Sequence, residues 1–159
     1  MKILVVSDTH GRDEKLEDAV MKEAPFDMLI HCGDVEGREI FIEALAECPC
    51  HIVSGNNDFF SDLPREEIVE IAGNRALVTH GHYYGVSRDI SGVLDEARER
   101  GCNAVFFGHT HKPFLETIDG VLVLNPGSLT YPRQRGRKSS YAVIEVDKNS
   151  KMAAEIRYL

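Results

Sequence analysis

Short apolar runs alternate with longer amphipathic segments through the first half of the chain. The apolar runs are rich in β-branched residues and predict strands at residues 2–6, 27–31 and 51–54. Two segments between them, at about 13–24 and 37–47, repeat apolar residues at the spacing of one helix face. This alternation is typical of βαβ units built around a parallel sheet.

After Pro64 the pattern changes. It predicts strands at 67–72 and 75–79, followed by a helix at about 87–100 with Ser87 as its N-cap and Gly101 as its C-cap. Further strands are predicted at 103–107, 114–118, 121–124, 140–146 and 153–158. The short loops that join the later strands are typical of hairpins. The whole pattern predicts an α/β fold with a mixed sheet, or two packed sheets, and helices outside.

The length of 159 residues is close to that of one domain, and no repeat or linker divides the chain. We therefore expect a single domain over residues 1–159. The net charge of −8 argues against a nucleic-acid or anionic-membrane partner held by general electrostatic attraction. A small anionic substrate stays open, because a local cluster of metal ions can reverse the sign of a site.

Cysteine usage and hydropathy indicate the compartment. The four cysteines lack paired C-x-x-C spacing and the density of a disulfide scaffold, so we expect them to be reduced and in the core. They are Cys32, Cys48, Cys50 and Cys102. No apolar run approaches the roughly 20 residues of a membrane span. Met1 leads directly into the first predicted strand, and the expected location is the cytoplasm.

Five predicted strands are each followed directly by side chains that can bind metal. The clusters are Ser7-Asp8-Thr9-His10, Cys32-Gly33-Asp34, Ser54-Gly55-Asn56-Asn57-Asp58, Thr79-His80-Gly81-His82 and Gly108-His109-Thr110-His111. Ligands bind at the carboxyl ends of parallel strands, so these clusters are expected to meet on one rim. Any one cluster alone could be a turn, but five in order are hard to explain as turns.

The spacing within two clusters adds a geometric expectation. In an extended segment, residues two apart point to the same side and lie about 6.6 Å from each other. Asp8 with His10, and His109 with His111, would then each face one pocket and could serve two ions roughly 3.5–4 Å apart. The isolated His31 and His51 are interpreted as core or surface residues rather than ligands.

Taken in order, D-x-H, G-D, G-N-x-D, H-G-H and G-H-x-H resemble the motifs of the calcineurin-like metallophosphoesterases. The segment Asn125-Pro126-Gly127-Ser128 with Pro132-Arg133, and the short length, are similar to the small YfcE-type phosphodiesterases. The resemblance implies a four-layer α/β/β/α sandwich with a dinuclear metal site at the strand ends. By matching position, the first ion is held by Asp8, His10, Asp34 and His111, and the second by Asp34, Asn56, His80 and His109.

The resemblance also implies a reaction. Two divalent cations lower the pKa of a shared water, and the resulting hydroxide attacks phosphorus in line and expels the alcohol of a small phosphate ester. Carboxylate, carboxamide and imidazole donors without thiolate suit Mn²⁺, Fe or Zn²⁺ better than Ca²⁺. Mn²⁺ is favoured, and Ni²⁺ is a further alternative.

One position departs from the larger relatives, in which a histidine follows the motif asparagine and can protonate the leaving oxygen. Here that position is Asn57, whose amide cannot supply a proton near pH 7. Aryl esters should therefore be cleaved far better than alkyl esters. His82 is the candidate substitute acid. Asp58 either orients a neighbouring ligand or loop amide, or is a solvated turn residue.

The only basic run is Arg133-Gln-Arg-Gly-Arg-Lys138. Arg133 could pair with a phosphate, because a guanidinium binds phosphate in a bidentate manner. A solvated loop before the strand at 140 is the favoured interpretation of the run. The segment Asn125-Pro126-Gly127-Ser128 is expected to shape the loop beside the metal pocket.

Two functions from different classes fit these observations. The leading one is a metal-dependent phosphodiesterase; the rival is a non-catalytic scaffold of the kind that the retromer vacuolar sorting subunit, which resembles this group, represents. Every expected ligand position still carries a competent side chain, which favours the enzyme. Phe59-Phe60 and Tyr83-Tyr84 could form a partner surface, a homodimer contact, a pocket wall or core. A nuclease is disfavoured, because a capping domain and a broad basic face are both missing.

Overall fold

The computed structural model describes residues 1–159 as two mixed five-stranded sheets with three α-helices. The first sheet, in the order β10-β9-β1-β2-β3, contains β1 (Lys2–Val6), β2 (Met28–His31), β3 (Cys50–Ile52), β9 (Ser140–Val146) and β10 (Met152–Tyr158). The second, in the order β4-β5-β6-β8-β7, contains β4 (Glu66–Ile71), β5 (Asn74–Thr79), β6 (Ala104–Phe106), β7 (Pro113–Ile118) and β8 (Val121–Pro126). The helices are α1 (Glu14–Glu23), α2 (Glu39–Ala46) and α3 (Ser91–Glu99), with a 3₁₀ turn at His82–Tyr84.

Each sheet contains three neighbouring parallel strands. β1, β2 and β3 run parallel, and β9 pairs antiparallel with β1. In the other sheet β5, β6 and β8 are parallel, and β4 and β7 close the two edges in antiparallel fashion. The parallel strands of each sheet therefore deliver their carboxyl ends to one edge of that sheet.

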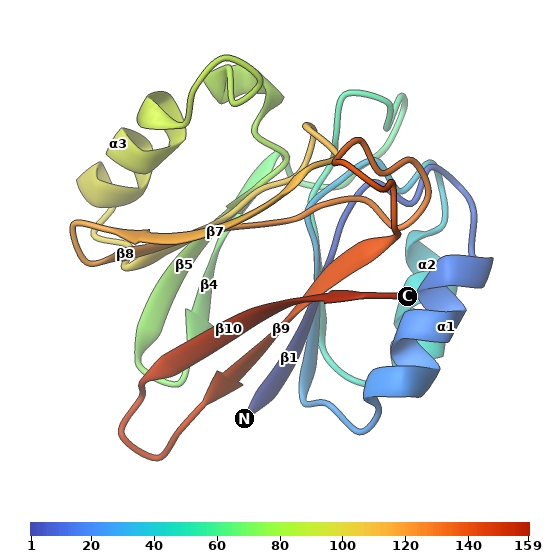
Figure 1. Cartoon of the computed structure of the whole chain (residues 1–159), viewed down its shortest axis with the longest axis horizontal. Coiled ribbons are helices and arrows are strands. Elements are labelled where there is room, and N and C mark those ends of the chain that lie inside the picture. The colour runs from blue at the N-terminus through green and yellow to red at the C-terminus, as the bar shows by residue number, and fades with distance from the viewer.

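Alternation along β1 shows how the layers form. Ile3 and Val5 face the other sheet in the central core, whereas Leu4 and Val6 pack with residues of α1 and α2. A third cluster joins the second sheet to α3. Figure 1 shows α1 and α2 outside one sheet and α3 outside the other. The predicted four-layer α/β/β/α sandwich is confirmed, and two packed sheets are the correct form of the prediction.

All predicted helices and strands are present, with ends displaced by a few residues. The largest displacement is at α3, which begins at Ser91, so the prediction that Ser87 caps it was wrong. Asp89 instead accepts the Ser91 N–H at 2.9 Å. The unpredicted 3₁₀ turn precedes this point and lies between Gly81 and Gly85, both at positive φ. The C-cap of α3 is Arg100 rather than the predicted Gly101, which follows it with φ of 67° and donates its N–H to the carbonyl oxygen of Arg98.

The cysteines are all free thiols. Cys32 and Cys102 are buried, but Cys48 and Cys50 are only half-buried, so the expectation of core positions holds for two of the four. None of the helices has the length and apolar character needed to cross a membrane.

Candidate metal centre

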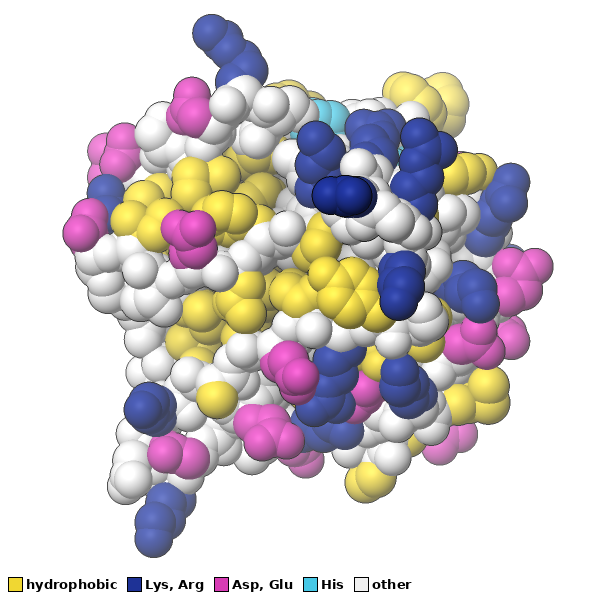
Figure 2. Space-filling model, in the orientation of Figure 1, with side chains coloured by type: hydrophobic (Ala, Val, Ile, Leu, Met, Phe, Trp, Pro, Cys, Tyr) yellow, Lys and Arg dark blue, Asp and Glu magenta, His cyan; other side chains and the backbone are white.

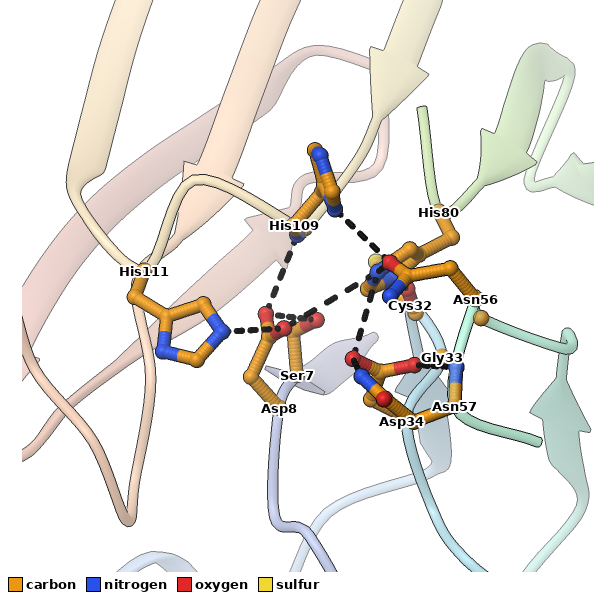
Figure 3. Close-up of polar contacts among 12 residues, drawn as sticks. Ser7, Asp8, Cys32, Gly33, Asp34, Asn56, Asn57, His80, His109 and His111 are labelled. Carbon is orange, nitrogen blue, oxygen red and sulfur yellow. Dashed lines mark hydrogen bonds and ion pairs between the residues drawn. The ribbon is translucent and has the colours of Figure 1, made fainter. Parts of the chain in front are cut away.

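The carboxyl ends of the parallel strands of both sheets meet at one end of the sandwich. Loops that follow β1, β2 and β3 supply the oxygen donors and one imidazole, and loops that follow β5 and β6 supply three imidazoles. The structure brings together all seven predicted ligands: Asp8, His10, Asp34, Asn56, His80, His109 and His111. The rim is shared by two sheets rather than belonging to one. Figure 3 shows six of these side chains, those of Asp8, Asp34, Asn56, His80, His109 and His111, gathered from different segments.

The first group contains Asp8, His10, Asp34 and His111. One ligand atom from each lies within 4.8 Å of the others. His111 Nε2 is 3.1 Å from Asp8 Oδ1, and His10 Nε2 is 3.6 Å from Asp34 Oδ2. The two imidazole nitrogens, His10 Nε2 and His111 Nε2, lie 3.3 Å apart. The separations of 3.1, 3.3 and 3.6 Å are those expected between donors to one divalent cation, whose bonds to nitrogen and oxygen are about 2.0–2.2 Å long.

The second group lies beside the first. Asn56 Oδ1 is 2.8 Å from His109 Nδ1 and 3.0 Å from His80 Nε2. His80 Nε2 is also 3.5 Å from Asp34 Oδ2. The Asp34 carboxylate therefore lies within reach of both groups, as Figure 3 shows.

Asp8 tests whether these residues suit a cation. Its side chain is 0% exposed; Oδ2 accepts bonds from the Ser7 hydroxyl and the His109 N–H, whereas Oδ1 accepts none. Burial alone would raise the pKa of Asp8, yet His111, His80 and Ser7 together hold that pKa below its usual value. Asp8 is therefore a buried carboxylate whose Oδ1 has no hydrogen bond and lies 3.1 Å from the imidazole nitrogen Nε2 of His111. A bound cation would satisfy this oxygen, so the donor set fits a metal.

Three of the imidazole rings are held in place by a contact through Nδ1, the ring nitrogen that faces away from the centre. The Nδ1–H groups of His80 and His111 donate to the carbonyl oxygens of Cys32 and Tyr131, at 2.7 and 2.8 Å. His10 Nδ1 lies 2.8 Å from Glu36 Oε1. With the proton on Nδ1, each ring presents the lone pair of Nε2 to the centre, which is the arrangement typical of metal-bound histidine.

No local sequence pattern indicates these supporting groups. Glu36 lies just after Asp34, but an exposed glutamate carries no local signal of this role. The carbonyl groups of Cys32 and Tyr131 have no signal at all, because every residue has a carbonyl.

The backbone at the ligands differs from the prediction. Asp8, His10, His109 and His111 have φ of 54°, 50°, 67° and 58°, which is left-handed rather than extended. The expectation that extended spacing orients these pairs was therefore wrong. The chain turns sharply after each strand, and this turn aims the side chains inward. Left-handed non-glycine residues cost free energy and gather at functional sites.

Two glycines allow the loops to approach closely. A Cβ on Gly108 would collide with the Ser7 hydroxyl and the Asp8 carboxylate. A Cβ on Gly55 would collide with the carboxylate of Asp34. A larger residue at either position would displace a candidate ligand.

Asn57 and Asp58 both contact the loop that carries Asp34. The backbone N–H and side-chain Nδ2 of Asn57 donate to the two oxygens of Asp34, at 2.8 and 2.7 Å. Asp58 accepts the backbone N–H groups of Asp34, Gly55 and Glu36 at 2.8, 2.6 and 2.6 Å. Asp58 thus ties two ligand loops together through their amides, and Asn57 fixes the orientation of the Asp34 carboxylate.

The end of β8 and the residues that follow it support the centre from the other side. Asn125 Nδ2 donates to the carbonyl of Gly108 at 2.7 Å, and Ser128 Oγ donates to the carbonyl of Asp8 at 2.8 Å. As expected, Asn125-Pro126-Gly127-Ser128 shapes the loops beside the pocket.

A cavity of about 680 Å³, here called the polar cavity, opens over the centre. It is lined by His10, Asp34, Asn56, Asn57, His109, His111, Thr130, Tyr131, Pro132, Arg133 and Arg137. Arg133 donates its backbone N–H to the carbonyl of His111 at 2.9 Å. The basic run thus lies over the ligands. Figure 2 shows Lys and Arg side chains gathered over the segment between β8 and β9, next to a visible histidine edge.

The other candidate histidines lie apart from this cavity. The His82 ring packs 5.4 Å from His80 and 6.0 Å from His109, and burial together with these imidazoles lowers the pKa of His82. His82 lines a neighbouring cavity instead. His31 contacts Thr9 and the Gly33 N–H, and burial lowers its pKa to about 4. His51 pairs with Glu67 at 2.8 Å. As expected, neither His31 nor His51 joins the ligands.

Comparison with known proteins identifies relatives of the same kind. The chain is 37% identical to YsnB of Bacillus subtilis, named a probable metallophosphoesterase, over 99% of this chain and 90% of that protein. It is 32% identical to a phosphodiesterase of Methanocaldococcus jannaschii over 80% of this chain and 83% of that protein.

Solved structures share the fold. A Streptococcus pneumoniae protein named a predicted phosphoesterase superposes with a TM-score of 0.85 at 29% identity, over 99% of this chain and 88% of that one. Vps29 of Entamoeba histolytica superposes with a TM-score of 0.78 over 100% of this chain and 99% of that one, and its 21% identity shows the fold alone.

The model of the calcineurin-like phosphoesterase superfamily domain matches residues 1–149. The chain belongs to this family, and the resemblance inferred from the motifs is confirmed.

Proposed function

We propose that this member of the calcineurin-like phosphoesterase family is a metal-dependent phosphodiesterase acting on a small phosphate ester. The observation that carries the proposal is the Asp8 carboxylate, which is buried and has no hydrogen bond on Oδ1. This oxygen faces imidazole nitrogens at the base of the polar cavity. A buried carboxylate with a purely structural role would have hydrogen-bond donors of the protein beside both of its oxygens.

The residues that would hold the ions follow from the two groups. Asp8, His10, Asp34 and His111 would hold one, Asp34, Asn56, His80 and His109 the other, with Asp34 shared. Mn²⁺ is favoured, and Fe, Zn²⁺ or Ni²⁺ suit the same donors. Two bound cations supply an activated water near neutral pH and neutralise charge on phosphate oxygens.

The chain's own groups receive and orient the ester. Arg133 and Arg137 line the polar cavity, and neither forms an ion pair, whereas Arg38, Arg98 and Arg100 are paired with carboxylates. Two free guanidinium groups over the candidate metal centre suit the anion of a phosphate ester. Asn57 and Asp58 hold the Asp34 loop, so both are assigned to positioning of the shared ligand.

The residue at the position of the usual proton donor, Asn57, cannot protonate the leaving oxygen. Asn57 donates its Nδ2 hydrogen to Asp34, and its amide has no proton to give up. His82 is the candidate substitute acid; it lines the neighbouring cavity, and its ring packs against the rings of His80 and His109. Substrates with good leaving groups, such as aryl esters, should therefore react much faster than alkyl esters. His82→Asn should slow alkyl esters more than aryl esters if His82 is the donor.

A non-catalytic scaffold is the second candidate, favoured by the fold shared with Vps29. A scaffold has no need of an intact set of convergent donors, so the seven ligand positions favour the enzyme. The two functions make opposite predictions about ester hydrolysis.

The test is hydrolysis of bis-p-nitrophenyl phosphate and p-nitrophenyl phosphate by metal-stripped protein, with Mn²⁺, Ni²⁺, Zn²⁺ or Mg²⁺ restored singly. We expect activity only after a metal is restored, faster cleavage of the diester, and loss of activity in Asp34→Ala. Activity that ignores chelation, or that survives in Asp34→Ala, would overturn the proposal. No hydrolysis with any of the metals would support the scaffold instead.

A further inference from the structure

A second cavity, here called the apolar cavity, adjoins the polar cavity. Its volume is about 470 Å³, within the range of small-ligand sites. Val86 and Phe107 are buried at 5% and 2% exposure and form its base, and the half-buried Ile90 and Phe114 form its walls. The polar cavity, in contrast, is lined almost entirely by polar and charged side chains.

The two cavities share one wall. Arg133 lines both of them, and its backbone is bonded to His111. Thr110, which lies between the candidate ligands His109 and His111, also lines the apolar cavity. A phosphate ester bound beside Arg133 in the polar cavity would therefore have the apolar cavity next to it. Figure 2 shows hydrophobic surface between α3 and the β7–β8 edge, beside the gathered basic side chains.

The composition of the apolar cavity indicates an aromatic occupant. Phe107 and Phe114 offer ring surfaces against which a flat ring packs favourably. The charged side chains on its lining are Lys112 and Arg133, neither of which is in an ion pair. Both can lie over a ring face as cation–π partners, and no carboxylate lines the cavity to repel a phosphate ester nearby.

Of the two substituents of a phosphodiester, the retained one suits this cavity better. The leaving oxygen gains negative charge in the transition state, and an apolar wall disfavours that charge. The retained substituent stays neutral throughout. We propose that the apolar cavity binds an aromatic ester group that remains on the phosphate, so that the substrate is an aryl- or nucleoside-like phosphodiester. The proposal rests on the phosphodiesterase function proposed above.

The test compares two diesters with one leaving group: phenyl p-nitrophenyl phosphate and methyl p-nitrophenyl phosphate. Release of p-nitrophenolate is followed in both, so the ratio of kcat/KM reports the retained group. Burial of a phenyl ring in place of a methyl group should favour the phenyl ester by about 10-fold or more. Phe114→Ala removes an aromatic side chain from the cavity wall, and Ser87→Trp places a large side chain into the cavity from an exposed position on its lining. Each variant should reduce the preference for the phenyl ester to about 2-fold or less.

The matched control is Tyr83→Ala, which removes an exposed aromatic ring from the neighbouring cavity lined by His82. It should leave the phenyl-to-methyl ratio unchanged. Thermal unfolding of each variant reports whether the fold is intact, and an unchanged rate on the methyl ester reports an intact metal centre. A ratio that stays at the wild-type value in both Phe114→Ala and Ser87→Trp overturns the proposal. A ratio that falls only in Tyr83→Ala overturns it in favour of the other cavity.

A binding measurement separates this proposal from the catalytic one. Phenylphosphonate and methylphosphonate are titrated calorimetrically into Mn²⁺-loaded protein. Tighter binding of phenylphosphonate that is lost in Ser87→Trp supports the apolar cavity even if neither diester is hydrolysed, in which case the proposed function fails alone. Equal affinity for the two phosphonates overturns the proposal about the cavity whatever the enzyme hydrolyses.

Discussion

Two buried carboxylates lie in different regions of this molecule and are treated in opposite ways. Glu23, at the end of α1, is 3% exposed and accepts a hydrogen bond from the Tyr141 hydroxyl at 2.7 Å. Its other oxygen pairs with Lys2 and Arg157 at 3.0 and 2.6 Å. Asp8, at the end of β1, is 0% exposed and has an oxygen with no hydrogen bond.

The difference separates a structural carboxylate from one reserved for a ligand. Burial of an unpaired charge is expensive, so a protein normally supplies partners, as it does for Glu23. Around Asp8 the chain instead supplies imidazoles whose Nε2 atoms need not carry protons. A cation completes the second arrangement, whereas the first is complete without one.

The largest expected effect is the loss of activity when the Asp8 carboxylate is replaced by an amide. Asp8→Asn should lower kcat/KM for bis-p-nitrophenyl phosphate by about 10³-fold, because a neutral amide is a poor cation ligand at the base of the site. Glu23→Gln is the control, a matched change in an equally buried carboxylate, and it should leave kcat/KM unchanged. Steady-state kinetics with saturating Mn²⁺ measures both. Equal losses in the two variants would mean that Asp8 acts through the fold alone.

Metal removal should give the next largest effect. Each group of donors draws on loops from both sheets, so bound ions would join the sheets. At 100 times the dissociation constant, binding stabilises the folded state by about 2.7 kcal/mol. Denaturant unfolding with Mn²⁺ and with a chelator measures the gain. Glu23→Gln should keep this gain and Asp8→Asn should lose most of it; a chelator without effect on wild-type unfolding would argue against a metal site.

The smallest effect concerns Glu23 and pH. Burial raises the pKa of Glu23, but Tyr141, Lys2 and Arg157 together lower it below the usual 4.5. A lowered folded-state pKa means that the stabilisation is complete above about pH 4.5 and is lost as pH falls through the folded-state pKa. Glu23→Gln should therefore cost about 1.5 kcal/mol near pH 7. The unfolding free energies of wild type and variant should converge in acid; a constant difference down to pH 2 would contradict the ion-pair account.

The ligand positions were predictable for a specific reason. Hydrophobic runs mark the strands, and the polar residues that end each run must lie at a sheet edge. Asp8, Asp34 and His80 each follow such a run directly. Convergence therefore needed only the parallel order of the strands, which the βαβ pattern supplied.

The orientation of those ligands was not predictable. Extended spacing failed for Asp8 with His10, because the chain enters left-handed turns directly after the strand. The turns depend on long-range bonds such as that from the His10 N–H to the carbonyl of Asp34. No local pattern contains such a bond. The support of His10 by Glu36 was hidden for the same reason.

The sequence by itself determined the helices, the strands and the residues that lie at the strand ends, because these follow from the periodicity of side chains along each segment; the pattern left open whether the strands form one mixed sheet or two packed sheets. Only the tertiary structure decided that two sheets share the rim, that Arg133 separates a polar cavity from an apolar one, and that one oxygen of Asp8 lacks a hydrogen bond. These features depend on distances between segments a hundred or more residues apart in the chain, such as those that carry Asp8 and His109. Such distances are set when the whole chain packs.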